Sequence, residues 1–97
     1  MPTYIVLSSF TEQGIKNVKD SPKRADAVKD LAKKSGATLK EMYWTLGLYD
    51  IVAVVEAPDD ETMTALGLNI GKQGNVRTQT LRAFSAEEMK GIMGKVA

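Results

Sequence analysis

The side chains that could take part in acid–base chemistry are carboxylates, tyrosines and arginine, because the sequence contains no histidine and no cysteine. That absence excludes imidazole bases, thiolate nucleophiles, disulfides and zinc or iron sites built from histidine and cysteine. The remaining candidates for proton handling are Tyr43, Asp50, Glu56 and Arg82. A carboxylate can act as a base when burial raises its pKa. A cofactor-independent enzyme is therefore one function that the sequence leaves open.

Two short motifs suggest cofactor or metal sites but do not fit them. The glycine-containing segment 67–74 has neither the spacing of a dinucleotide-binding loop nor that of a Walker phosphate loop. Asp59, Asp60 and Glu61 lie at an expected helix start, where the helix dipole favours acids, and they lack the spacing of an EF-hand. We therefore predict no cofactor and no metal site.

Charge and hydropathy argue against nucleic-acid and membrane partners. The 97 residues carry a formal net charge of +1, which creates no field that would attract polyanions. The segment 49–56 carries valines and acids where RNA-recognition domains carry stacking aromatic and basic residues. The sequence has no signal peptide and no apolar run of about 20 residues, so we expect a cytoplasmic protein.

The elements that would position the candidate side chains are organised around residues 43–58, with a turn at Gly47 and an apolar run at 51–55. Glycine adopts the positive φ angle that a short reversal needs, so we predict a hairpin here. The periodicity of apolar residues and the capping residues predict the other elements. Strands are expected at 3–10, 37–46, 51–55 and 76–84, and the main helices begin at Ser21, Pro58 and Ser85.

Local signals predict how the helices begin. Ser21 is expected to cap the first main helix, after a short helical segment at 11–19 that Gly14 weakens. Residues 85–88 have the spacing of a capping box. We expect the C-terminal helix that follows to dock against the domain through an apolar stripe of Met89, Ile92, Met93 and Val96.

The order of the elements is βαββαβ followed by one helix. Two right-handed crossovers that flank a hairpin give an antiparallel sheet of strand order 4-1-3-2 with helices on one face. This arrangement is the ferredoxin-like α+β fold. The length predicts a single domain that spans residues 1–97.

The alternation of side chains along each strand assigns residues to the two faces of the sheet. We expect the helices to cover the sets that hold Ile5, Leu7, Met42, Trp44, Ile51, Ala53, Val55, Leu81 and Ala83. The other face would carry Phe10, an apolar centre of Val6, Val52 and Val54, and the candidate ligand-binding or interface residues Tyr4, Ser8, Tyr43, Thr45, Asp50, Glu56, Thr78, Thr80 and Arg82. We predict that Glu56 and Arg82 form a pair, or share a water, at one end of this face.

The apolar run at 51–55 needs cover on both sides. One cover is the protein's own helices, and the other is expected to be a second copy, in an isologous homodimer that closes two sheets into a sandwich or barrel. The sequence favours a non-catalytic homo-oligomer that binds a small molecule or a protein partner at this interface. The alternative is a cofactor-independent enzyme of the dimeric α+β barrel type.

Three segments support a family resemblance. They are Gly47-Leu48-Tyr49-Asp50 running into 54–59, then 74–84, and upstream 20–24. Together they resemble the GYD domain family over nearly the whole chain, with Leu48 standing between the glycine and the Tyr-Asp pair. The resemblance implies a small prokaryotic protein with a dimeric ferredoxin-like fold, and it assigns no catalytic residues.

Overall fold

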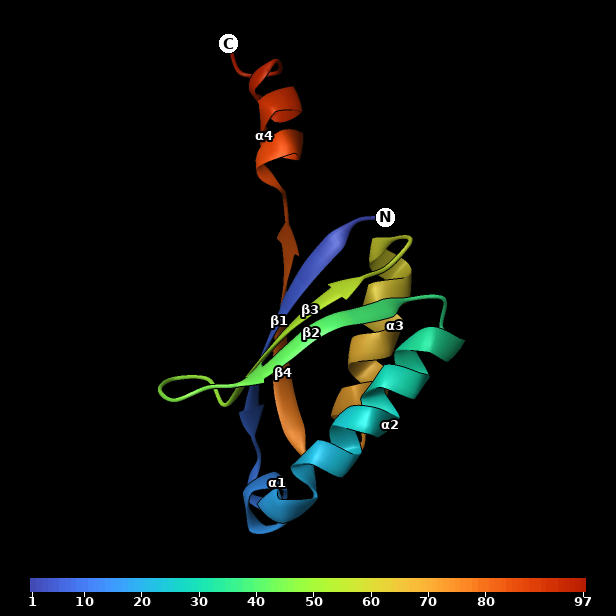
Figure 1. The fold of residues 1–97 in the computed structure, drawn as a ribbon, viewed down its shortest axis with the longest axis vertical. Helices are drawn as coiled ribbons and strands as arrows, with labels where there is room; N and C mark the ends of the chain where they lie inside the picture. Colours follow the sequence, from blue (N-terminus) through green and yellow to red (C-terminus); the bar gives the residue numbers. More distant parts are fainter.

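The computed structural model describes all 97 residues, and its elements follow the predicted order (Figure 1). The strands are β1 (Thr3–Phe10), β2 (Thr38–Trp44), β3 (Ile51–Glu56) and β4 (Val76–Ala83). The helices are α1 (Glu12–Lys16), α2 (Ser21–Lys34), α3 (Asp60–Gly71) and α4 (Ala86–Met93), with a 3-10 turn at Val18–Asp20. None of them combines the length and apolarity that a membrane-spanning helix requires.

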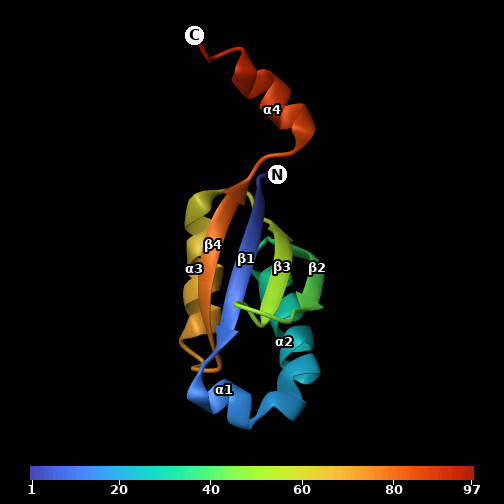
Figure 2. The same ribbon diagram turned by 90° about the vertical axis from the view of Figure 1, so that its left-hand side faces the viewer.

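The four strands form one antiparallel sheet of order β2-β3-β1-β4. This is the predicted order 4-1-3-2 counted from the other edge, so the ferredoxin-like α+β fold is confirmed. Helices α2 and α3 lie on one side of the sheet, and the other side carries no helix (Figures 1 and 2). The fold therefore divides the strand residues into a helix side and an open side.

The predicted capping box of α4 is confirmed, whereas α3 begins at Asp60, two residues after the predicted start at Pro58. Asp59 accepts a hydrogen bond from the first turn of α3, and Ser85 and Glu88 form the capping box of α4. The prediction that Ser21 caps α2 is wrong, because α2 begins at Ser21 itself. The Ser21 hydroxyl instead accepts a hydrogen bond of 2.8 Å from the Trp44 indole N–H, which ties α2 to β2.

The faces of β1 and β4 are the reverse of the predicted assignment. Directly paired residues of an antiparallel sheet project to the same side, and Tyr4 pairs with Val55 of β3 and with Arg82 of β4. Because Val55 is buried under the helices, Tyr4 and Arg82 also lie on the helix side. The register moves Tyr4, Val6, Ser8, Phe10, Thr78, Thr80 and Arg82 to the helix side, and it moves Ile5, Leu7, Leu81 and Ala83 to the open side.

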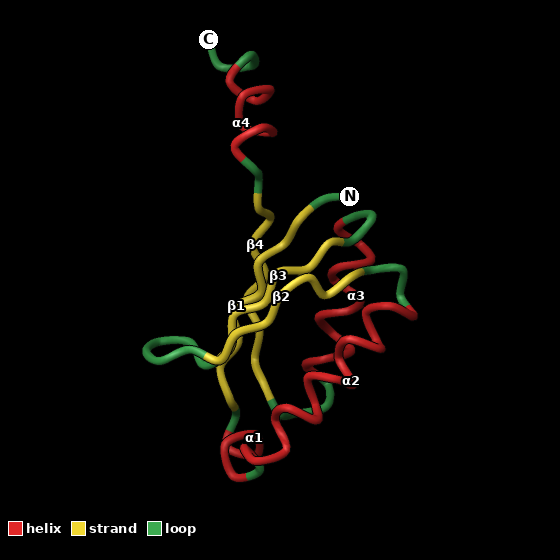
Figure 3. The backbone as a smooth tube through the Cα atoms, viewed as in Figure 1, coloured by secondary structure: helices red, strands yellow, loops and turns green.

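The hairpin between β2 and β3 is confirmed. Gly47 has a φ angle of +125°, and the Thr45 N–H donates to the Asp50 carbonyl at 2.8 Å. The loop between them protrudes from the open side of the sheet (Figure 3). Leu46 and Leu48 of this loop are exposed, so the hairpin presents two large aliphatic side chains to solvent.

The buried core is small for a chain of this length. Met63 and Leu66 of α3 are its largest fully buried side chains, and only 13 of 97 residues are buried. An apolar cavity of about 70 Å³ lies between the sheet and helices α2 and α3. Ligand pockets start near 300 Å³, so this cavity is a packing void rather than a ligand site.

The prediction that the C-terminal helix docks against the domain is wrong. Helix α4 leaves the end of β4 and projects beyond the sheet (Figures 1 and 2), in a molecule that measures 50 × 31 × 18 Å. None of its residues is buried; Met93 at its end is 50% exposed, and Val96 beyond the helix is 62% exposed. The predicted apolar stripe is present, but nothing in the subunit covers it.

Helix α1 packs closely against the segment that precedes β4. A Cβ atom built on Gly14 would lie 1.9 Å from the Asn75 carbonyl oxygen, which no side chain tolerates. The Thr11 N–H donates to the same oxygen at 3.1 Å. By contrast, a Cβ atom on Gly67 of α3 would meet nothing within 4 Å, so the two glycines occupy opposite environments.

Replacing Gly14 with alanine is expected to lower the free energy of unfolding by about 1–3 kcal/mol, the usual cost of overpacking. The matched variant G67A has room for its methyl group and should raise the free energy of unfolding by up to about 1 kcal/mol, because alanine favours the helix. Urea unfolding at one fixed protein concentration measures both. Equal unfolding free energies for the two variants would contradict the close contact at Gly14.

Candidate binding surfaces

The open side of the sheet carries an aliphatic cluster that crosses three strands, which we call the open-face patch. Its members are Ile5 and Leu7 of β1, Val52 and Val54 of β3, and Leu81 of β4. Ile5 pairs directly with Val54 and with Leu81, and Leu7 pairs with Val52, so their side chains are neighbours. Leu81 is 41% exposed, and no helix covers the patch (Figure 2). The patch thus forms a continuous apolar surface.

Two of the predicted site residues, Tyr43 and Glu56, lie on the open side at the rim of this patch. Tyr43 is 54% exposed, and its hydroxyl donates to the Glu41 carboxylate at 2.7 Å. That hydrogen bond to an acceptor raises the pKa of Tyr43. Glu56 forms an ion pair of 3.8 Å with Lys40. An apolar centre with a polar rim is the usual layout of a protein interface.

Thr45 and Asp50 form hydrogen bonds within the fold through their side chains, and Ser8 forms one through its backbone carbonyl. The Thr45 hydroxyl donates to the Tyr49 carbonyl at 2.6 Å, and the Asp50 carboxylate accepts from the Phe10 N–H at 2.8 Å. Ser8 is buried on the helix side, and its carbonyl accepts from the Asp50 N–H at 2.8 Å. The two contacts of Asp50 join the end of β1 to the hairpin, and the Thr45 contact lies within the hairpin.

The other predicted site residues, Tyr4, Thr78, Thr80 and Arg82, line a groove between α3 and the edge strand β4. Its volume is about 700 Å³, which lies within the range of ligand pockets, roughly 300–1,000 Å³. We call it the α3–β4 groove, and it lies on the helix side of the sheet. Its further lining residues are Asp60, Met63, Thr64, Gly67, Leu68, Gly71 and Lys72.

Sequence reasoning missed the α3 wall of this groove. The sequence predicts Asp60 only as an acid at a helix start, and it gives Lys72 no role. The signal that could have found the wall is the spacing of Gly67 and Gly71, which removes side chains from one strip of α3. A Cβ atom on either glycine would meet nothing within 4 Å, so the strip faces open space.

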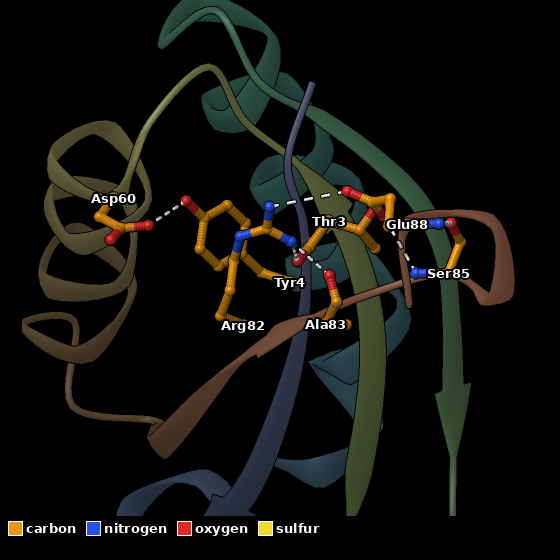
Figure 4. A network of polar contacts seen from close by, with 7 residues as sticks. All are labelled: Thr3, Tyr4, Asp60, Arg82, Ala83, Ser85 and Glu88. Atoms are coloured by element: carbon orange, nitrogen blue, oxygen red, sulfur yellow. Dashed lines mark hydrogen bonds and ion pairs between the residues drawn. The ribbon is translucent and has the colours of Figure 1, made fainter. Parts of the chain in front are cut away.

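Tyr4 and Arg82 form a polar network at one end of the groove (Figure 4). The Tyr4 hydroxyl donates to Asp60 at 2.5 Å, and the Arg82 guanidinium lies 5.7 Å from the centre of the Tyr4 ring and 4.4 Å from that of Phe84. Arg82 also donates to the Thr3 carbonyl at 3.3 Å. The hydrogen bond to Asp60, together with burial, raises the pKa of Tyr4 to about 12. Tyr4 is therefore a fixed donor at neutral pH, not a base.

The predicted contact between Glu56 and Arg82 is wrong. The two residues are near the same end of the sheet, but they project from opposite faces because Arg82 shares the face of Tyr4. Arg82 instead forms an ion pair of 3.8 Å with Glu88 of α4. The four proton-handling candidates, which also include Tyr43 and Asp50, each contact a different neighbour and do not converge on one point.

Removing the carboxylate with D60N should lower the pKa of Tyr4 from about 12 towards its ordinary value of 10.0. The folded protein favours the protonated phenol of Tyr4. The contribution of Tyr4 to the free energy of unfolding is therefore complete below pH 10, and it is lost as the pH rises towards 12. Ultraviolet titration of tyrosine ionisation measures the shift, with Y4F identifying which step belongs to Tyr4. If the ionisation step at the highest pH is still present in Y4F, that step does not belong to Tyr4 and the raised pKa of Tyr4 is wrong.

Three solved structures share this fold. The leucine response regulatory protein LrpA of Mycobacterium tuberculosis matches with a TM-score of 0.66 and 16% identity, over 88% of this chain and 51% of that one. FFRP-DM1 matches with a TM-score of 0.63 and 19% identity, over 87% of this chain and 100% of that one. TTHA0845 of Thermus thermophilus matches with a TM-score of 0.51 and 28% identity, over 89% of this chain and 96% of that one. The first two similarities concern the fold alone.

Sequence comparison gives a more specific relationship. The chain is 37% identical over 90 residues to the "Glutamine synthetase and cystathionine beta-lyase binding protein" of Thermus thermophilus, which covers 92% of this chain and 95% of that protein. The family model described as the GYD domain matches residues 4–93. The chain therefore belongs to the GYD domain family.

Proposed function

We propose that this protein is a non-catalytic binding module that associates with itself through the open-face patch and binds a protein partner in that assembled form. The observation that carries the proposal is the patch itself, where Ile5, Leu7 and Val54 form an aliphatic surface on the side of the sheet that no helix covers. Such a surface offers no group for chemistry. It has the composition of the core of an interface.

The exposed area supports self-association. The chain exposes 6612 Å², whereas a compact monomer of 10.6 kDa should expose about 5,500 Å². Its radius of gyration is 14.5 Å, against about 12.5 Å for a compact domain of this length. The excess is about 1,100 Å² per copy, so two copies could hide about 2,200 Å², which is enough for a stable interface.

The relative from Thermus thermophilus supports a protein partner. Its name states that it binds glutamine synthetase and cystathionine beta-lyase, and it aligns with this chain over 90 residues. We propose that this chain likewise binds a metabolic enzyme, with those two as the first candidates. In this proposal the module acts by contact with the enzyme and contributes no catalytic group of its own.

A second candidate function is small-ligand binding in the α3–β4 groove. The observation that favours it is the groove's volume of about 700 Å³ together with Asp60, Lys72 and Arg82 at its walls. A cofactor-independent enzyme would have to use this groove too, because the open-face patch supplies no reactive group. The raised pKa of Tyr4 makes binding a better description of the groove than proton transfer.

The variant V54D is expected to weaken self-association by at least about 100-fold, because an unpaired carboxylate at a buried interface costs several kcal/mol. The matched control is L68D on α3, which adds the same charge at a residue that is 69% exposed and lies outside the patch. Light scattering coupled to size-exclusion chromatography measures the mass of each. A wild-type protein that remains monomeric at high concentration would contradict the proposal.

The partner is tested separately. Glutamine synthetase and cystathionine beta-lyase from the same organism as the chain are immobilised in turn, and binding of the wild-type protein is followed by interferometry. We expect saturable binding to at least one of the two enzymes, because a relative of 37% identity is named for binding both. If the protein self-associates but binds neither enzyme, the partner assignment fails while the role of the patch stands.

A further inference from the structure

We propose that α4 is an exchanged arm: in the dimer formed through the open-face patch, α4 of each copy packs against the β2–β3 hairpin loop of the other. This inference rests on the proposed self-association and adds the orientation of the two copies. The surfaces that meet are the apolar stripe of α4, which includes Met89 and Met93, and the loop residues Leu46 and Leu48.

The arm is a formed helix that lacks the packing a short helix needs. Helix α4 has eight residues, and isolated helices shorter than about 12–15 residues are marginal in water. Its capping box satisfies the N-terminal N–H groups, but none of its residues is buried. Met89 and Met93 of the helix are 39% and 50% exposed. A surface outside the subunit must therefore supply the packing.

The first turn of α4 is held in a direction that leads away from its own sheet. Arg82 forms an ion pair of 3.8 Å with Glu88 and lies over the Phe84 ring. The Ser85 N–H donates to the Glu88 carboxylate at 3.0 Å, as Figure 4 shows. These contacts fix the start of the arm at the end of β4, so its own subunit does not cover the stripe.

The hairpin loop lies at the opposite end of the same sheet. Thr3 pairs with both Glu56 and Ala83, so the end of β4 meets the end of β3, and the loop before β3 is at the far end. The loop protrudes on the open side (Figure 3), which is the side that a second copy would cover. Leu46 and Leu48 are its exposed apolar residues.

One symmetry brings these two surfaces together. A two-fold axis that lies between the facing sheets and runs across the strands reverses the strand direction in the second copy. Each arm then lies beside the partner's hairpin loop, and the contact occurs twice, as an isologous interface requires. The projecting arm and loop also add to the surface of each copy, which is 6612 Å² against about 5,500 Å² for a compact monomer.

Cysteine crosslinking tests the contact cleanly because the natural chain contains no cysteine. The double variant L46C/M93C should form a disulfide-linked dimer on mild oxidation, seen on non-reducing gels, because the two positions lie at opposite ends of one subunit. The control L68C/M93C, which places the first thiol at another exposed position on α3, should stay unlinked. Linked dimers of M93C alone would place the two arms side by side and overturn the proposal.

A second measurement distinguishes the contribution of α4 from that of the open-face patch to self-association. M93S should raise the dimer dissociation constant at least about tenfold, because each dimer loses two buried methionine contacts, whereas K90S on the same helix should leave it unchanged. A wild-type monomer would refute the proposed self-association and the arm together. A wild-type dimer that neither crosslinks through L46C/M93C nor weakens in M93S would refute the arm alone.

Discussion

The structure depends on a single constraint, which is that β3 is apolar on both of its faces while the subunit covers only one. Val55 and Ala53 are buried under α2 and α3, whereas Val52 and Val54 project from the uncovered side. A strand that faces water on one side normally alternates apolar with polar residues. The open-face patch, the small core and the projecting C-terminal helix are all consistent with a chain whose packing is completed by another copy.

Much of the fold could be predicted because its signals are local. Gly47 marks the hairpin, residues 85–88 mark the capping box, and the order of elements restricts the sheet to one arrangement. The faces of β1 could not be predicted in the same way. Its two alternating sets hold Ile5 and Leu7 on one side and Tyr4 and Val6 on the other, so hydrophobicity does not choose between them. The pairing of β1 with β3 decides which of the two sets faces the helices.

The candidate site was harder to predict for the same reason. Tyr4 and Asp60 are far apart in the sequence, and they meet only because β1 lies beside β4 and under α3. The register exchanges the two predicted faces of β1 and β4, so Arg82 lies on the face opposite Glu56 and lines the α3–β4 groove. The stripe on α4 was recognised as apolar, but a stripe of side chains specifies burial without specifying the surface that provides it.

The central claim is that a second copy covers the open-face patch, and methyl protection in solution tests it most directly. In the wild-type protein, a soluble paramagnetic agent should attenuate the methyl signals of Val52 and Val54 no more than those of the core residue Val55. If the Val52 and Val54 methyl signals are instead attenuated strongly at high protein concentration, the patch faces water and the account is wrong.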